Sequence, residues 1–102
     1  METQQIYDMV NLSPEEILQL NTLEELVKLT HQLNDVGTGT SEVKTAIRER
    51  ANQLINIMVD TVTEQNILNY KYEIGKLSTT TILTGSDIDG SMNRLDHKLN
   101  NK

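Results

Sequence analysis

Apolar positions along this chain recur mainly with the period of an α-helix, and the first such stretch is NLSPEEILQL. Ser13 is suited to the N-cap, Pro14 to the first helical position, and Glu16 to the reciprocal position of a capping box. Residues of these types compensate for the backbone N–H groups that the first turn of a helix leaves without a partner. The pattern therefore predicts a short helix over residues 14–20.

A second helical segment follows at once. Asn21 or Thr22 can cap its start, and Gly37 is the residue type that commonly ends a helix. We predict a helix over residues 22–36, because the apolar side chains in between form one broad face. This face consists of Leu23, Leu26, Val27, Leu29 and Leu33.

The third helical pattern is the longest. Thr40 or Ser41 can cap it, and its apolar positions recur at spacings of four and three, namely Val43, Ile47, Ala51, Leu54, Met58 and Val62. The same stripe predicts that this long central helix runs on to about residue 75, through Ile67, Tyr70, Ile74 and Leu77. The segment TEQN at 63–66 is wholly polar, however, and the stripe shifts its phase there. It indicates a bend, a stutter or a point where the inward face changes partner.

These elements predict an all-α fold, an antiparallel helical hairpin preceded by a short N-terminal helix. A turn of a few residues makes the second and third helices antiparallel neighbours. At about 1.5 Å per residue the second helix spans roughly 22 Å and the third roughly 50 Å, so the hairpin is lopsided. Its far half would be an exposed apolar patch unless N-terminal residues, the C-terminal segment or another protomer covers it. The N-terminal residues suited to this role are Ile6, Met9 and Val10.

The end of the chain has a weaker pattern. The segment STTTILTGSD at residues 78–87 interrupts the helical period and is expected to be a linker that follows a helical domain of residues 1–77. After it, four apolar residues recur at spacings of four, three and four: Ile88, Met92, Leu95 and Leu99. A helix of about 12 residues is marginal alone in water. We therefore expect residues 88–102 to form a short amphipathic helix, with a frayed end, that is ordered by docking on a surface.

Composition limits the core that these helices can form. The chain has 102 residues, enough for one domain, and contains no Phe, no Trp and three Tyr. Since an aromatic side chain buries about 150 to 250 Å², their scarcity predicts either an elongated aliphatic core or one that another copy of the chain completes, and we favour the second. We therefore expect a homo-oligomer.

Charge and residue types limit the classes of binding partner and the cellular compartments that are compatible with this chain. The formal charge of −6 disfavours nucleic acid, because affinity for phosphate comes from clustered Lys and Arg, and the 9 such residues here are dispersed. Cysteine is absent, the N-terminus lacks a basic leader, and the longest apolar run, IMV, is too short to span a membrane. We expect a cytoplasmic protein. A composition rich in Asn, Ile and Thr suits a low-GC bacterium or a phage, for which the compartment is the host cytoplasm.

The segment GSDIDGSMNRLDH contains part of the pattern of a calcium-binding loop. Aligning Gly90 with the glycine of such a loop places Asp87, Asp89 and Asp96 at three of its ligand positions. The first ligand position is then Gly85, which has no side-chain oxygen, and Asp96 is one carbon shorter than the usual glutamate. A helix cap formed by Asp87 or Asp89 is the favoured interpretation, with the cation site as the alternative.

Other candidate chemistry is incomplete. GTGTSEVKT has the glycines of a phosphate-binding loop, but Val43 stands where that loop needs a glycine, and a helical turn is favoured. His31 and His97 do not stand at the spacing of metal ligands, and no Ser-His-Asp order is present. We expect neither catalysis nor a cofactor.

The function that remains is binding. We expect a non-enzymatic helical protein-protein interaction module, such as an assembly factor, adaptor or inhibitor, that acts as a homo-oligomer and holds a further protein. The alternative is a ligand-binding module, with a cation at the three aspartates or a small anion between protomers. The predicted interface residues are Met58, Val62, Ile67, Tyr70, Ile74, Ile88, Met92, Leu95 and Leu99.

Overall fold

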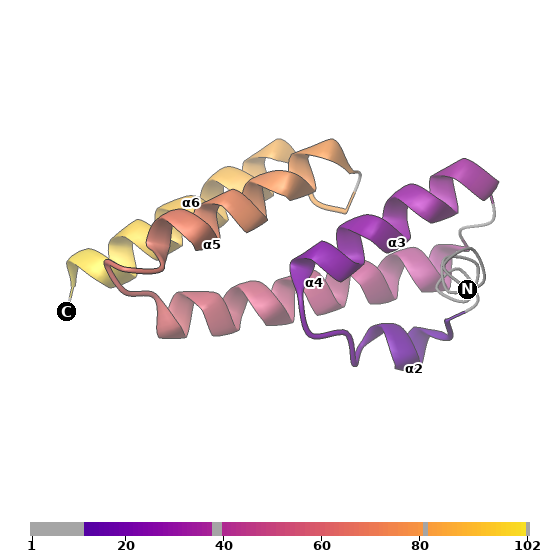
Figure 1. Cartoon of the computed structure of the whole chain (residues 1–102), viewed down its shortest axis with the longest axis horizontal. Coiled ribbons are helices and arrows are strands. Elements are labelled where there is room, and N and C mark those ends of the chain that lie inside the picture. Colours follow the sequence, from indigo (N-terminus) through magenta and orange to yellow (C-terminus); the bar gives the residue numbers. More distant parts are fainter. Residues whose placement is uncertain (1–11, 38–39, 81, 102) are drawn as a thin grey trace.

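Helices are the only regular elements in the residues that the structure describes. The computed structural model describes residues 12–37, 40–80 and 82–101. It contains no strand there, and the prediction of an all-α protein is confirmed. Along the chain the elements are α2 (Pro14–Ile17), α3 (Leu23–Val36), α4 (Ser41–Thr61), α5 (Ile67–Gly75), the 3₁₀ helix η1 (Lys76–Thr79) and α6 (Gly85–Asn100) (Figure 1). None of these helices is long and apolar enough to cross a membrane.

The first two helices begin where their capping residues predict. In α2 the Ser13 hydroxyl accepts a hydrogen bond from the Glu16 N–H (3.3 Å), and the Glu16 carboxylate accepts one from the Ser13 N–H (3.1 Å). Thr22 caps α3 with its side chain, and Gly37 ends that helix in the left-handed conformation, at a φ of 68° that glycine adopts without strain. α2 ends at Ile17, after a single turn, and is shorter than predicted.

The predicted continuous helix over residues 41–75 is wrong, because α4 stops at Thr61. In the turn that follows, the Asn66 side-chain oxygen accepts a hydrogen bond from the Thr63 N–H (2.7 Å), and the Thr63 hydroxyl accepts one from the Asn66 N–H (3.3 Å). The Asn66 amide also donates to the Thr61 carbonyl (3.1 Å), which the end of the helix leaves open. These side-chain bonds compete with helix continuation, and the buried Val62 anchors the point where the chain reverses.

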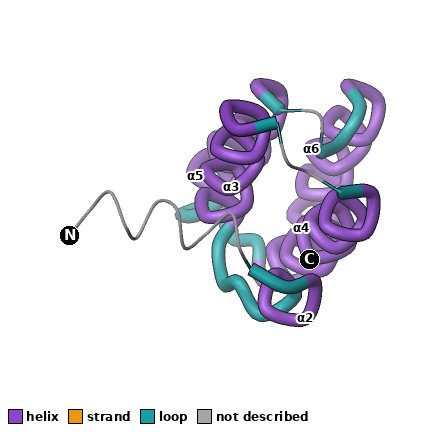
Figure 2. Tube along the Cα trace, turned by 90° about the vertical axis from the view of Figure 1, so that its right-hand side faces the viewer, coloured by secondary structure: helices purple, strands orange, loops and turns teal. Residues whose placement is uncertain are grey.

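The two halves of α4 are covered by different elements (Figure 1). α2 and α3 pack against the first half, α6 packs against the second half, and α5 packs against α6. α3 and α5 lie roughly in line, which the view along the long axis also shows (Figure 2). The C-terminal segment therefore covers the far half of the central helix. The N-terminal residues considered for that role, Ile6, Met9 and Val10, lie outside the described residues.

The segment expected to be a linker, residues 78–87, contributes to the fold. Its first residues complete η1, and Ile82 and Leu83 are buried in the core. α6 begins at Gly85 rather than at residue 88, because Thr84 caps it with a hydroxyl that accepts from the third residue of the helix. The chain therefore packs through this segment instead of passing over the surface.

One aliphatic cluster connects all of these helices. Every helix contributes at least one fully buried side chain, and the residue that follows α4 contributes another. These side chains are Ile17, Leu26, Leu29, Ile55, Val62, Ile74, Leu77 and Leu95. Two arginines of α4 attach the connecting segments to this core. The Arg50 Nε donates to the Leu20 carbonyl (2.6 Å), and the Arg48 Nε donates to the Ile82 carbonyl (3.1 Å).

Candidate functional site

The three aspartates considered for a cation site all lie in α6. Asp87 accepts hydrogen bonds from the Thr84 N–H (3.2 Å) and the Thr84 hydroxyl (2.9 Å), and the Thr84 hydroxyl accepts one from the Asp87 N–H (3.2 Å). Thr84, rather than Asp87 or Asp89, is the N-cap. Asp87 thus takes part in the cap as the reciprocal member of a capping box.

The helix continues through Gly90, so regular helix stands where a calcium loop would have to gather the aspartates. Asp96 forms an ion pair with Lys71 of α5, at 2.8 Å. Asp87 and Asp96 are separated by about half a turn of rotation and by roughly 13 Å along the helix axis. In the described part of the chain, no three His, Cys, Asp or Glu side chains are grouped so that they could hold a metal ion.

The predicted interface residues divide by burial. Met58, Val62, Ile74, Ile88 and Leu95 are buried within a single chain. The other four are half-buried and pack against the same cluster, namely Ile67, Tyr70, Met92 and Leu99. Packing within one chain thus accounts for the apolar pattern of the buried five.

Large apolar side chains that remain exposed lie at positions outside the predicted stripe. Leu68 is 78% exposed and Tyr72 is 65% exposed, and both belong to α5, while Ile57 of α4 is 54% exposed. Leu68 and Tyr72 are four residues apart and therefore share one face of the helix. The Lys76 ammonium lies 4.7 Å from the centroid of the Tyr72 ring. We call Leu68 and Tyr72 the α5 face.

The α5 face was missed because the sequence shows two sets of apolar positions in this helix. Ile67, Tyr70 and Ile74 continue the period of the central stripe, and they were assigned to one long helix. The spacing of Leu68 and Tyr72 is equally compatible with a helical face. Only the direction of the core distinguishes the two sets.

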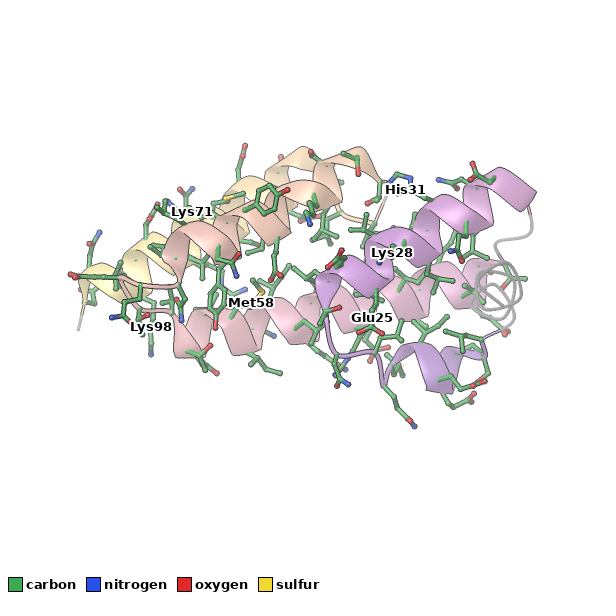
Figure 3. All side chains as sticks on the ribbon, viewed as in Figure 1. Glu25, Lys28, His31, Met58, Lys71 and Lys98 are labelled. Carbon is green, nitrogen blue, oxygen red and sulfur yellow. The ribbon has the colours of Figure 1, made fainter. Side chains whose placement is uncertain are left out.

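His31 lies where α3 meets η1 (Figure 3). Its Nε2 is 3.2 Å from the Thr79 hydroxyl, and the ring is exposed. The contact joins the two helices across the junction between the halves of the molecule. The neighbour of the His31 ring is therefore a threonine hydroxyl, which has a structural role, and not a second metal-ligating side chain.

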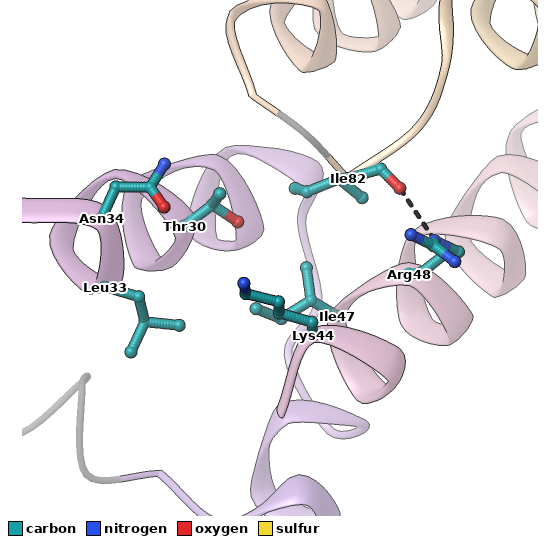
Figure 4. A pocket seen from close by; sticks show the side chains of 7 residues that line it. All are labelled: Thr30, Leu33, Asn34, Lys44, Ile47, Arg48 and Ile82. Atoms are coloured by element: carbon teal, nitrogen blue, oxygen red, sulfur yellow. Dashed lines mark hydrogen bonds between the residues drawn. The ribbon is translucent and has the colours of Figure 1, made fainter. Parts of the chain in front are cut away.

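A partly enclosed cavity of about 200 Å³ lies between α3, α4 and the segment before α6 (Figure 4). Its walls combine buried aliphatic side chains with polar ones, and the lining residues are Thr30, Leu33, Asn34, Lys44, Ile47, Arg48 and Ile82. Lys44 directs its ammonium into the space between the two helices (Figure 4). No sequence motif indicated this cavity, because its lining comes from three segments that are far apart in the chain.

The α5 face and the cavity beside Lys44 are the two surface features from which we infer a function, since one combines exposed apolar side chains and the other a partly enclosed space with a lysine. Comparison of the chain with known protein families, curated proteins and solved structures finds no match. Function is therefore inferred from these two features.

Proposed function

We propose that this chain is a non-enzymatic helical module for protein-protein interaction, which acts in the cytoplasm as a homo-oligomer. The observation that carries the proposal is the α5 face, on which Leu68 is 78% and Tyr72 is 65% exposed. Adjacent large apolar side chains gain hydrophobic free energy when a partner covers them. The antiparallel hairpin of α3 and α4 provides the scaffold in this proposal.

A two-fold contact between two α5 helices suits this face. In such a contact, residue i of one copy meets residue j of the other, and the reverse. Antiparallel packing would therefore place Leu68 of each copy against Tyr72 of the other. Lys71, which precedes Tyr72 and lies three residues after Leu68, is already paired with Asp96 at 2.8 Å, and this pairing reduces charge repulsion between two copies.

The remaining helical faces are then displayed twice in the assembled protein. A second protein with two equivalent contacts would gain affinity from both at once. A function as an assembly factor, adaptor or small inhibitor fits this arrangement.

The experiment that tests self-association is sedimentation equilibrium of the full chain at about 10 to 200 μM, a range that detects micromolar dissociation constants. We expect the wild-type chain to approach the mass of a dimer. Leu68→Glu and Tyr72→Glu each place a charge at the centre of the proposed contact, and both variants should sediment as single chains.

Ile57→Glu is the matched control, because it introduces the same charge at another exposed apolar position, on α4. This variant should still dimerise, and far-UV circular dichroism should show unchanged helix content in all three variants. A wild-type mass of one chain over the whole range would contradict the proposal. Loss of the dimer in Ile57→Glu alone would move the contact away from α5.

A further inference from the structure

We infer that the cavity between α3 and α4 binds a small amphiphilic carboxylate, a molecule with one anionic head and one short apolar body. The simplest members of this class are medium-chain fatty acids such as octanoate. The inference concerns a different surface from the α5 face, and it does not depend on self-association.

The apolar part of the site is formed by side chains that are already ordered by the core. Leu33, Ile47 and Ile82 line the cavity and are 5%, 2% and 5% exposed. They come from α3, α4 and the segment before α6, and each is fixed in place because its own segment is packed in the core. An apolar cavity of about 150 Å³ accommodates benzene, and this cavity of about 200 Å³ therefore has room for a slightly larger body.

The anionic head is indicated by two cations on one face of α4. Lys44 and Arg48 both line the cavity and are four residues apart, a spacing at which like charges repel each other. The ion pairs of the described residues are Lys28 with Glu24 and Lys71 with Asp96, so Lys44 has no carboxylate partner among them. An anion at the mouth of the cavity would relieve this repulsion.

The donors around the cavity suit a carboxylate. The Arg48 Nε donates to the Ile82 carbonyl (3.1 Å), which fixes the guanidinium beside the cavity and leaves its terminal N–H groups for a ligand. The Asn34 amide stands on the opposite wall, whereas the Thr30 hydroxyl already donates to the Leu26 carbonyl (2.9 Å). Lys44, which directs its ammonium into the space between the helices, is the charged donor for the carboxylate head (Figure 4).

Larger polyanions fit less well. The chain carries a formal charge of −6, so a ligand with several negative charges is repelled at long range. The aliphatic side chains of the lining also provide no hydrogen-bond partners for further polar groups of a ligand, so burial of those groups would be unfavourable. An apolar body with one charge satisfies both conditions.

The experiment is a titration of the ¹⁵N-labelled full chain with octanoate at about 0.1 to 5 mM, followed by amide chemical shifts. We expect saturable shifts concentrated at residues that line the cavity, including Leu33, Ile47 and Ile82. Octanol, which has the same body without the charge, should bind about fivefold to tenfold more weakly, because the charged hydrogen bonds at the head are lost.

Lys44→Gln is the decisive variant, and Lys28→Gln, at an exposed lysine of α3 that is not among the lining residues, is its matched control with the same change in net charge. Lys44→Gln should weaken octanoate about fivefold to tenfold and reduce the preference over octanol, while Lys28→Gln leaves both unchanged. Equal binding of octanol and octanoate to the wild-type chain would overturn the inference. Shifts that do not saturate, or that map to the α5 face, would overturn it as well.

Discussion

The two halves of α4 differ in how the chain covers them. The first half is covered by α2 and α3, which precede it and are joined to it by short connections. The second half is covered by α6, which returns to it only after the chain has reversed twice. The first arrangement follows from local caps and one glycine turn, whereas the second requires a break in an otherwise continuous apolar stripe.

The difference shows that one pattern of apolar residues is compatible with two different folds. The stripe from Ile47 to Ile74 shifts its phase at residues 63–66, and such a shift is compatible both with one bent helix and with two helices that fold back. A continuous helix would leave its far half bare, and that bare half was a reason to expect a second copy of the chain. In the folded chain α6 covers it, and the proposal of self-association depends instead on the α5 face.

The largest expected effect tests whether the two halves share one core. Leu26 of α3 and Leu95 of α6 are both 0% exposed. Leu26→Ala and Leu95→Ala should each lower the free energy of unfolding by about 2 to 5 kcal/mol, because each leaves a cavity in the same cluster. Urea unfolding followed by circular dichroism should show a single transition in both variants.

The exposed Ile57, which lies outside the proposed dimer contact, provides the control for these two truncations, and Ile57→Ala should change the free energy of unfolding by less than about 0.5 kcal/mol. An early separate transition in Leu95→Ala alone would mean that the second half unfolds by itself. In that case the two halves would be independent units rather than one core.

A smaller effect is expected at the turn that separates the halves. Asn66→Ala removes the acceptor of the Thr63 N–H and the donor to the Thr61 carbonyl. We expect the free energy of unfolding to fall by about 1 to 2 kcal/mol, as measured by urea unfolding. Gln65→Ala, at the exposed neighbouring position, should have little effect. Equal stability of the two variants would show that Val62 and the packing of α5 on α6 define the turn without the asparagine.

The smallest effect compares one ion pair from each half. Lys71 and Asp96 are 2.8 Å apart with side chains 31% and 46% exposed, while Lys28 and Glu24 are 3.8 Å apart and 63% and 53% exposed. Lys71→Met should cost about 0.5 kcal/mol of stability and Lys28→Met close to nothing, since solvent screens the more exposed pair. Thermal unfolding at low and high salt measures the loss of stability in both variants, and the loss in Lys71→Met should become smaller as the salt concentration rises. The opposite order of the two costs would contradict the assignment of Lys71 to the packing of α5 on α6.

Local signals in the sequence were sufficient for several helix boundaries. Ser13 with Glu16 predicted the start of α2. Asn21 or Thr22 was expected to cap α3, and the cap is Thr22, while Gly37 predicted its end. These features depend on hydrogen bonds within a few residues, which the residue types themselves specify. The start of α6 was placed too late because Thr84, in a segment rich in threonine, was not recognised as its cap.

The sequence by itself determined that this chain is helical, where the first helices begin and which residues are apolar enough to form a core. The phase shift at residues 63–66 marked where the central stripe is interrupted, but only the tertiary structure decided that α4 ends at Thr61 and the chain folds back, that Asp96 pairs with Lys71, and which apolar side chains stay exposed on α5. It also decided that Lys44 and Ile82, which are far apart in the sequence, line one cavity. The reason is physical. Periodicity and caps act within a few residues, whereas the direction in which a helical face is buried depends on segments that meet only after the chain has folded.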